Sequence, residues 1–278
     1  FISIFAAEIM SSFDLSNFEW GTIYASGTLL SAAAMIYIGG SVDDYKTRNI
    51  SFLVLGVLTL AMLSMATFDS VAALIITIFF LRLMGQGMLT HLANVAMSRW
   101  FSRYRGRALA VANLGYSLGE SFLPMFFVGF LLVLPWRSIW LFSAIFPIVV
   151  AVAIYFTLKD ERSPKFFKED KVALGLGGRH WSRSQVLKSS IFWFAFPGLL
   201  GLPAFGTVLF FQQVNYASLK GWDHLSMVKA YPLFTMVAVG ISFLVGSLID
   251  RYSAIKLIGF YQIPAILGFY IFSICETL

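Results

Sequence analysis

Residues 39–50, GGSVDDYKTRNI, place two acids and two bases within six positions between two long apolar runs. No Asp, Glu, Lys or Arg occurs at residues 20–38 before this stretch or at residues 50–68 after it. An apolar run of about 20 residues crosses roughly 30 Å of hydrocarbon, because an α-helix rises about 1.5 Å per residue. The stretch is therefore predicted to be a polar turn between two membrane-spanning helices.

The composition extends this prediction to the whole chain. Hydrophobic residues make up 59% of the sequence and charged residues 12%, with a mean hydropathy of +0.80. A soluble domain would carry about 25% charged residues. We therefore predict an all-α polytopic membrane protein whose main partner is the lipid bilayer. The predicted spans are 18–40, 50–68, 71–98, 107–134, 138–158, 190–214, 226–249 and 255–275, and a partial span ends near residues 1–12.

The distribution of basic residues predicts the orientation. Loops 39–50, 99–107, 159–189 and 250–256 lie on one side of the predicted spans and contain sixteen of the twenty Lys and Arg residues. Cytoplasmic loops carry such an excess, so these four loops are predicted to be cytoplasmic. The net charge of +6 then reflects orientation, and no nucleic-acid partner is expected. The predicted location is the plasma membrane, which would be the bacterial inner membrane.

The longest polar stretch divides the chain. Residues 159–189 contain mixed charge, Pro and Gly and are predicted to be a cytoplasmic linker, more as a flexible loop than as a binding element. Residues 1–158 then form an N-terminal transmembrane half, and residues 190–278 form part of a C-terminal half. The chain begins inside an apolar segment and ends after one, so we expect a fragment of a longer protein.

The opening stretch has a second copy 207 residues later. Residues 246–256, GSLIDRYSAIK, place Gly246 over Gly39, Asp250 over Asp43 and Tyr252 over Tyr45. Each copy lies between the second and third spans of its half. Repeats at equivalent topological positions are typical of secondary transporters.

These residues resemble the major facilitator superfamily, whose loop between helices 2 and 3 reads G-x-x-x-D-R-x-G-R-R. The first copy retains Gly39, Asp43 and Arg48 and departs at Asp44 and Lys46, and the second retains Gly246, Asp250 and Arg251. The segment LRLMGQGM at 81–88 is similar to the R-x-x-x-G-x-G motif of helix 4. The segment at 99–124 is similar to the loop and fifth helix of many bacterial members.

This resemblance implies a twelve-helix fold of two pseudo-symmetric six-helix halves that rock around a central site. The chain would cover the end of helix 1 to helix 9. The resemblance also implies that Asp43 acts as a latch that contacts basic groups and a helix N-terminus across the halves. It implies a monomer without a cofactor, driven by a proton or solute gradient.

Arg82 is the one base in the middle of a predicted span. A base at the bilayer centre costs about 2.5–3.5 kcal/mol, so Arg82 is expected to face protein or water. At 100° per residue, Gln86 lies about 40° from Arg82, which predicts a polar stripe, whereas His91 lies opposite and is expected to be satisfied between helices. Arg82 is predicted to be an anion ligand or a proton-coupling residue. The alternative is a structural ion pair in which Glu8 or Glu120 neutralises it.

Four further polar residues complete the candidate substrate or coupling set. Asn113 and Glu120 fall on one face of span 107–134, and Gln212 and Gln213 end the Pro- and Gly-rich span 190–214. Glu120 is equally compatible with pairing across the bundle, and the two glutamines with capping the outer interface.

The predicted function is secondary active transport of a small solute by alternating access. Arg82 favours a small organic anion, and the layout of the spans resembles the monocarboxylate and oxalate/formate branches. The alternatives are a drug or metabolite efflux transporter of the same fold, a non-transporting membrane sensor, and an integral-membrane enzyme. An enzyme is not expected, because three His and one Cys offer no catalytic or metal-ligating spacing.

Overall fold

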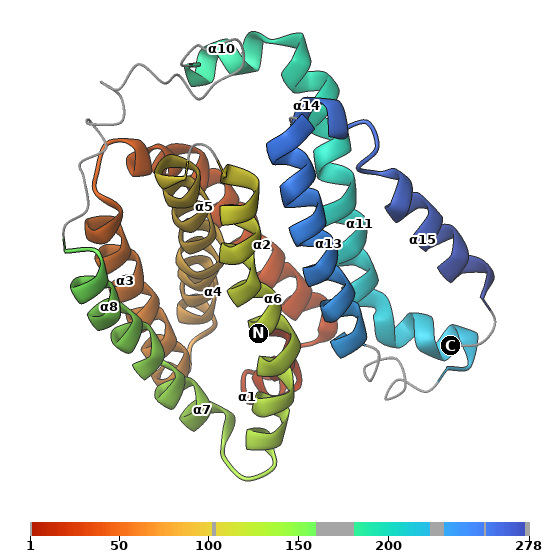
Figure 1. The fold of residues 1–278 in the computed structure, drawn as a ribbon. Coiled ribbons are helices and arrows are strands. Elements are labelled where there is room, and N and C mark those ends of the chain that lie inside the picture. The colour runs from red at the N-terminus through yellow and green to blue at the C-terminus, as the bar shows by residue number, and fades with distance from the viewer. Residues whose placement is uncertain (1, 102–103, 160–180, 223–230, 253, 276–278) are drawn as a thin grey trace. The chain divides into compact units, whose positions relative to one another are not determined.

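The computed structural model describes residues 2–101, 104–159, 181–222, 231–252 and 254–275, and within these ranges the regular elements are all helices (Figure 1). Seven helical segments of this described part are long and apolar enough to cross a membrane. They are Asn17–Asp43, Thr47–Thr67, Val71–Trp100, Arg105–Leu131, Trp136–Thr157, Ser190–Leu209 and Pro232–Tyr252. The predicted all-α polytopic fold is confirmed.

The elements follow the predicted spans closely in the first half of the chain. Their bounds are η1 Ile2–Phe5, α1 Ala6–Ser12, α2 Asn17–Ile38, η2 Gly39–Asp43, α3 Thr47–Thr67, α4 Val71–Phe80, η3 Leu81–Met88, α5 Leu89–Trp100, α6 Arg105–Leu131, α7 Trp136–Ser143 and α8 Ile145–Thr157. After residue 180 come α10 Arg183–Lys188, α11 Ser190–Lys220, α13 Tyr231–Tyr252, α14 Ala254–Leu257 and α15 Ile263–Ile274.

The chain forms two compact units. The first comprises Phe1–Trp100 and Leu118–Val172, and the second comprises Phe101–Ser117 and Ala173–Leu278. Helix α6 contributes its first part to the second unit and the remainder to the first. Most of the predicted linker, residues 160–180, lies outside the described residues, but its end forms the short helix α10. The division into 1–158, 159–189 and 190–278 remains a prediction.

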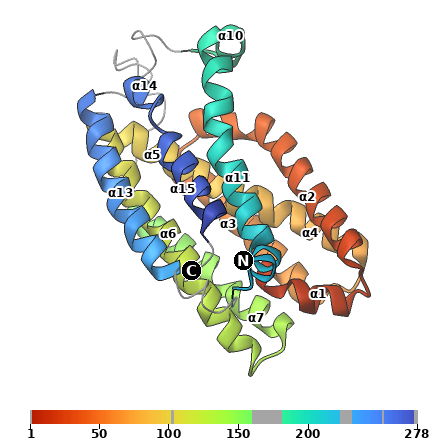
Figure 2. The same cartoon turned by 90° about the vertical axis from the view of Figure 1, so that its right-hand side faces the viewer.

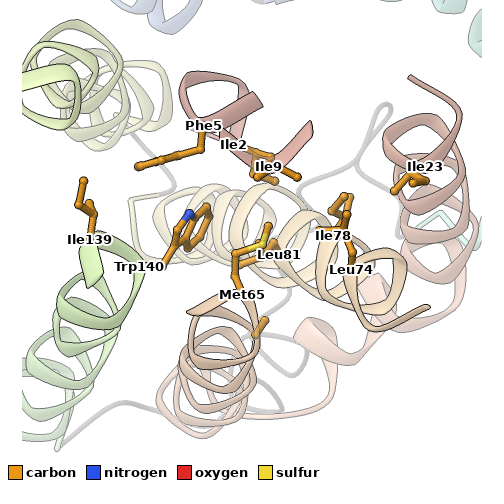
Figure 3. Close-up of a cluster of buried hydrophobic side chains, with 11 residues drawn as sticks. Ile2, Phe5, Ile9, Ile23, Met65, Leu74, Ile78, Leu81, Ile139 and Trp140 are labelled. Atoms are coloured by element: carbon orange, nitrogen blue, oxygen red, sulfur yellow. The ribbon is translucent and has the colours of Figure 1, made fainter. Parts of the chain in front are cut away.

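The first unit is built around α3 and α4. Helix α2 packs against α4 and η3, and α3 packs against α4, η3, α7 and α8. Figure 3 shows one cluster of buried side chains between these helices, in which Phe5, Ile78 and Trp140 have no exposed surface. The rings of Phe5 and Trp140 lie 5.5 Å apart. Large side chains on several helices thus fix their spacing, because a close-packed interior tolerates little displacement.

A second buried cluster lies where η2 meets the segment Val71–Trp100, which is the fourth span when the partial span at residues 1–12 is counted. Val42 of η2 is 1% exposed, and it packs with Val54 of α3 and Met88 of η3. Val42 therefore anchors the turn η2 in the packed interior, although the next two residues, Asp43 and Asp44, are exposed.

The turn between α1 and α2 follows from a local sequence signal. The Ser16 hydroxyl accepts the Glu19 N–H, and the Glu19 carboxylate accepts the Ser16 N–H at 2.8 Å. This capping box satisfies the first amide groups of α2, which have no partner within the helix. Asp14 precedes it with φ of 51°, a left-handed conformation that Asp tolerates better than most residues.

In the second unit, α11 and α15 lie side by side (Figure 2). The Tyr216 hydroxyl of α11 donates to the Phe272 carbonyl of α15 at 3.0 Å. Lys220 donates to the Ser273 carbonyl at 2.7 Å and to the Cys275 carbonyl at 3.1 Å. A lysine beside the C-terminal end of a helix stabilises the carbonyl groups that this helix leaves unpaired, and here Lys220 of α11 does so for α15.

Two predicted spans contain an interruption close to a proline, although the first of them still forms one apolar segment long enough to cross a membrane, Trp136–Thr157. Span 138–158 begins at Trp136 and is divided into α7 and α8 at Ala144, three residues before Pro147. Span 255–275 is divided into α14 and α15, and Pro264 lies in the first turn of α15. Proline lacks an N–H and fits the first turn of a helix better than its interior.

Span 190–214 shows the opposite outcome. Helix α11 continues through Pro197 and Pro203 to Lys220, so proline does not end it. The carbonyl of Gly198, between the two prolines, accepts a hydrogen bond from the Gln262 side chain. This bond joins α11 to the segment before α15, whereas the carbonyls that the two prolines leave without a helical donor are those of Trp193 and Leu199, four residues before each proline.

Helices α2 and α4 approach each other closely at Gly27. A Cβ atom at this position would lie 2.8 Å from Ile78 Cγ2 and 3.2 Å from the Phe79 nitrogen. We expect Gly27→Ala to lower the free energy of unfolding by about 1–3 kcal/mol, because overpacking forces the helices apart. The measurement is the melting temperature of the detergent-purified protein, monitored by size-exclusion chromatography with fluorescence detection.

Gly21→Ala is the matched control on the same helix, since a Cβ atom there meets nothing within 4 Å. It is expected to leave the melting temperature unchanged or to raise it slightly, because Ala favours a helix over Gly. Equal melting temperatures for the two variants would contradict the close contact.

Candidate functional site

The fourth span changes its helix type around Arg82. Helix α4 ends at Phe80, η3 is a π-helix over Leu81–Met88, and α5 resumes the α-helix at Leu89. The Leu89 N–H donates to the Met84 carbonyl, five residues earlier. The predicted polar stripe assumed α-helical rotation throughout, so its angles do not hold across 81–88. Short π-helical segments are rare and are frequent at functional sites.

Arg82 contacts Tyr24 of α2. Its Nη1 donates a hydrogen bond of 3.1 Å to the Tyr24 hydroxyl, and its Cζ lies 5.3 Å from the centre of the Tyr24 ring. Both side chains are partly buried. The residues are 58 positions apart in the sequence and come together because α2 packs against η3.

No acid balances Arg82 within the part of the chain that the structure describes. Three described ion pairs are Arg99–Asp43, Arg107–Asp250 and Arg137–Asp69, and none of them includes Arg82. Glu8 and Glu120, the two acids predicted as possible partners, form no ion pair with Arg82. One carboxylate oxygen of Glu8 is instead buried without a hydrogen-bond partner. The described contacts of Arg82 are therefore with a neutral phenol.

The other predicted substrate residues do not gather around this pair. Gln86 is exposed on η3, and Asn113 and Glu120 are exposed on α6. Asn113 belongs to the second unit and Glu120 to the first. Gln212 and Gln213 lie in α11, but their side chains are outside the described residues. The roles of these five residues remain predictions.

The first copy of the repeated loop is held by α5. Arg99 Nη2 donates to the Val42 carbonyl at 3.0 Å and to Asp43 Oδ1 at 3.4 Å. The Arg99 side chain is 10% exposed and that of Asp43 is 67% exposed. His91 Nε2 hydrogen-bonds the Gly39 carbonyl at 3.0 Å, so His91 is satisfied between elements as predicted. Arg48, the remaining motif residue, is partly buried near the start of α3.

The second copy contacts the first turn of α6. The Gly106 and Arg107 N–H groups donate to the two carboxylate oxygens of Asp250, at 2.7 and 3.3 Å. Arg107 Nε lies 3.9 Å from the same carboxylate, whose side chain is 12% exposed. A carboxylate is favoured at this position, because the first amide groups of a helix have no internal partner and carry a positive partial charge.

A close backbone contact accompanies this interaction. A Cβ atom at Gly106 would lie 2.2 Å from the Gly246 carbonyl oxygen, and one at Gly246 would lie 2.7 Å from the Gly106 carbonyl oxygen. Glycine at both positions lets α13 reach the start of α6, which brings Asp250 to the helix terminus. Arg251 is exposed, with its guanidinium 5.2 Å from the Tyr252 ring.

The two copies of the repeat therefore differ in their contacts. The resemblance implies that Asp43 contacts a helix N-terminus. Among the described residues Asp43 contacts a basic side chain alone, and Asp250 contacts the helix N-terminus. In the first copy α2 ends at Ile38 and the 3-10 turn η2 follows, whereas α13 continues as a helix past Asp250 to Tyr252.

Sequence reasoning missed three residues of these sites. Tyr24 lies in an apolar run with other aromatic residues, and nothing in that run marks it as a partner of Arg82. Arg99 was counted as a topology signal alone. Gly106 lies between two arginines at the start of a predicted span. This position next to a predicted cytoplasmic loop was the sequence signal that could have identified it.

The family model described as Major Facilitator Superfamily matches residues 1–278, the whole length of the chain. No curated protein matches the chain significantly.

Asp250→Asn tests the helix-terminus contact. We expect amide hydrogen exchange at Gly106 and Arg107 to accelerate about tenfold or more, because a hydrogen bond to a charged group contributes roughly 1.5–3 kcal/mol. Hydrogen–deuterium exchange with mass spectrometry of a peptide at the start of α6 measures this. Asp43→Asn is the matched control, since Asp43 accepts no backbone N–H in the described structure, and it should leave this peptide unchanged. Unaltered exchange in Asp250→Asn would refute the contact.

Proposed function

Since this chain belongs to the major facilitator superfamily, and is therefore a multi-pass membrane transporter, we propose that it is a secondary active transporter of a small organic anion. The proposed substrate class is a monocarboxylate or a similar small carboxylate, moved by alternating access. We further propose that a proton or solute gradient supplies the energy, without a cofactor. The proposed location is the bacterial inner membrane, and the proposed state is a monomer.

The observation that carries this proposal is the charge balance at Arg82. An arginine in a membrane span costs about 2.5–3.5 kcal/mol, and such residues normally pair with an acid or line a water-filled cavity. The described partner of Arg82 is the neutral Tyr24 hydroxyl. A substrate anion would supply the missing negative charge, so the uncompensated guanidinium supports an anion over a neutral or cationic solute.

The accessibility of the guanidinium also supports the proposal. Arg99 and Arg105 each have a guanidinium nitrogen that is buried without a hydrogen-bond partner, whereas Arg82 has none in this state. The Arg82 nitrogens that do not bond Tyr24 are therefore not fully buried, as contact with a small ligand would require.

The repeated loops support alternating access. Asp250 holds the first turn of α6 through two backbone amides, at an exposed fraction of 12%. Such a contact favours the conformation in which it forms and must break when α6 and α13 separate. Asp43, with a single exposed ion pair, contributes less, because surface ion pairs are worth about 0–1 kcal/mol.

Uptake into proteoliposomes tests the role of Arg82. We expect Arg82→Ala to lower uptake of labelled formate, acetate, pyruvate and oxalate by about a hundredfold, because loss of one partner of a buried charge pair costs roughly 2–5 kcal/mol. Arg82→Lys keeps the charge and should retain part of the activity.

Arg183→Ala is the control, since it removes one positive charge from the exposed helix α10. It should transport like the wild type. Carboxylate uptake that is unchanged by Arg82→Ala would remove Arg82 from the substrate site and overturn the proposed substrate class.

Asp43→Asn tests the gating role of the first loop. We expect the maximal transport rate to fall by up to about fivefold while the half-saturating substrate concentration changes little, because the ion pair to Arg99 is exposed and worth at most about 1 kcal/mol. Initial rates over a substrate concentration series measure both values. Equal losses of rate and affinity would indicate a folding defect instead.

A further inference from the structure

Tyr24 is absent from the motifs that identify the family, yet it is the described hydrogen-bond partner of Arg82. We propose that Tyr24 is a positioning residue, which holds Arg82 by Nη1 and so presents the Nε and Nη2 edge of the guanidinium to a carboxylate. This inference rests on the proposed function and specifies how the same site recognises its substrate.

Two contacts fix the guanidinium to Tyr24. The hydroxyl accepts from Nη1 at 3.1 Å, and the ring centre lies 5.3 Å from Cζ. The hydrogen bond selects one of the two terminal nitrogens, and the ring contact limits where the guanidinium plane lies. Arginine alone has several rotatable bonds, so one fixed nitrogen removes much of the freedom that the side chain would lose on binding an anion.

Tyr24 is itself held in place. Its ring lies 5.9 Å from that of Trp20 at an angle of 45°, and it packs against the buried cluster of Figure 3. One turn further along α2, Gly27 lets the helix approach Ile78, which is four residues before Arg82. This close contact sets the distance between α2 and the fourth span. The position of the hydroxyl therefore depends on helix packing and not on the Arg82 contact alone.

The donors of Arg82 indicate what the site binds. A guanidinium has five N–H donors, and in the described residues one of its nitrogens is bonded, Nη1. Nε and Nη2 are not among the nitrogens that are buried without a partner, so neither is fully buried. Their two N–H bonds point in parallel and match the two oxygens of a carboxylate. A halide is a single spherical acceptor and lacks the two oxygens that match two parallel N–H bonds, so the arrangement favours a carboxylate.

The experiment measures the reactivity of Arg82 directly. Phenylglyoxal modifies guanidinium groups, and mass spectrometry of the full-length, detergent-purified protein reports the rate at Arg82. Formate, acetate, pyruvate and oxalate serve as protectants, with chloride as the anion that lacks the two-oxygen geometry of a carboxylate. We compare the wild type with Tyr24→Phe, which keeps the ring and removes the hydroxyl.

Tyr37→Phe is the matched control. Tyr37 lies on the same helix, and its side chain is 80% exposed. Melting temperatures of the variants show whether each is folded.

The expected result is protection of Arg82 by at least one carboxylate and not by chloride in the wild type. In Tyr24→Phe, half protection of Arg82 should require a concentration of that carboxylate about ten times higher, because the variant loses a hydrogen bond to a charged group. Tyr37→Phe should behave as the wild type. In proteoliposomes Tyr24→Phe should raise the half-saturating concentration of the protecting carboxylate about tenfold with little change in the maximal rate.

A double variant separates positioning from packing. In an Arg82→Lys background the two-donor edge is absent, so Tyr24→Phe should change uptake less than twofold further. A purely structural role of the hydroxyl would instead give the same loss in both backgrounds.

The outcomes distinguish this inference from the proposed function. Equal protection of the wild type and Tyr24→Phe by the same carboxylate concentration would overturn the role of Tyr24 and leave the anion site in place. If none of the four carboxylates protects Arg82 in the wild type, both the anion site and the inference fail.

Discussion

A charge or a free backbone amide that is removed from water needs a partner, and the structure supplies such partners both within the spans and at helix ends. The Gly198 carbonyl accepts from Gln262, and the end of α15 is bonded by Lys220. The first amides of α6 are bonded by Asp250. Arg82 is the departure from this pattern, because its described contact is with a neutral hydroxyl. The proposed role of this charge is to bind an anionic substrate, a ligand that the chemistry of a guanidinium favours.

Close helix contacts determine where these polar groups meet. Gly27 brings α2 against α4, and the Tyr24–Arg82 contact follows one turn away. Gly106 and Gly246 bring α13 against the start of α6, and the Asp250 contact follows one turn away. In lipid, small residues permit such approaches without help from a hydrophobic driving force between helices. Each candidate site is thus adjacent to a glycine at which a Cβ atom would meet the neighbouring helix.

The internal repeat illustrates how similar sequences acquire different contacts. Asp43 and Asp250 occupy equivalent positions in the repeat, but the first ends a 3-10 turn and is mostly exposed, while the second lies on a continuous helix and is mostly buried. Surface ion pairs contribute little, whereas a buried carboxylate on two backbone amides contributes more. Unequal strength of the two loops is therefore a physical consequence of the backbone around them.

The sequence by itself determined the all-α membrane fold, the positions of most spans and the family, because these depend on apolar run length and on short motifs. Arg82 was identified in the same way, since a charge in an apolar run is visible without a structure. Only the tertiary structure showed that Arg82 meets Tyr24, that Glu8 and Glu120 do not neutralise it, and that Asp250 rather than Asp43 contacts a helix terminus among the described residues. Those contacts join residues 58 and 144 positions apart, and they depend on helix spacing and on the π-helical turn, which apolar periodicity does not encode.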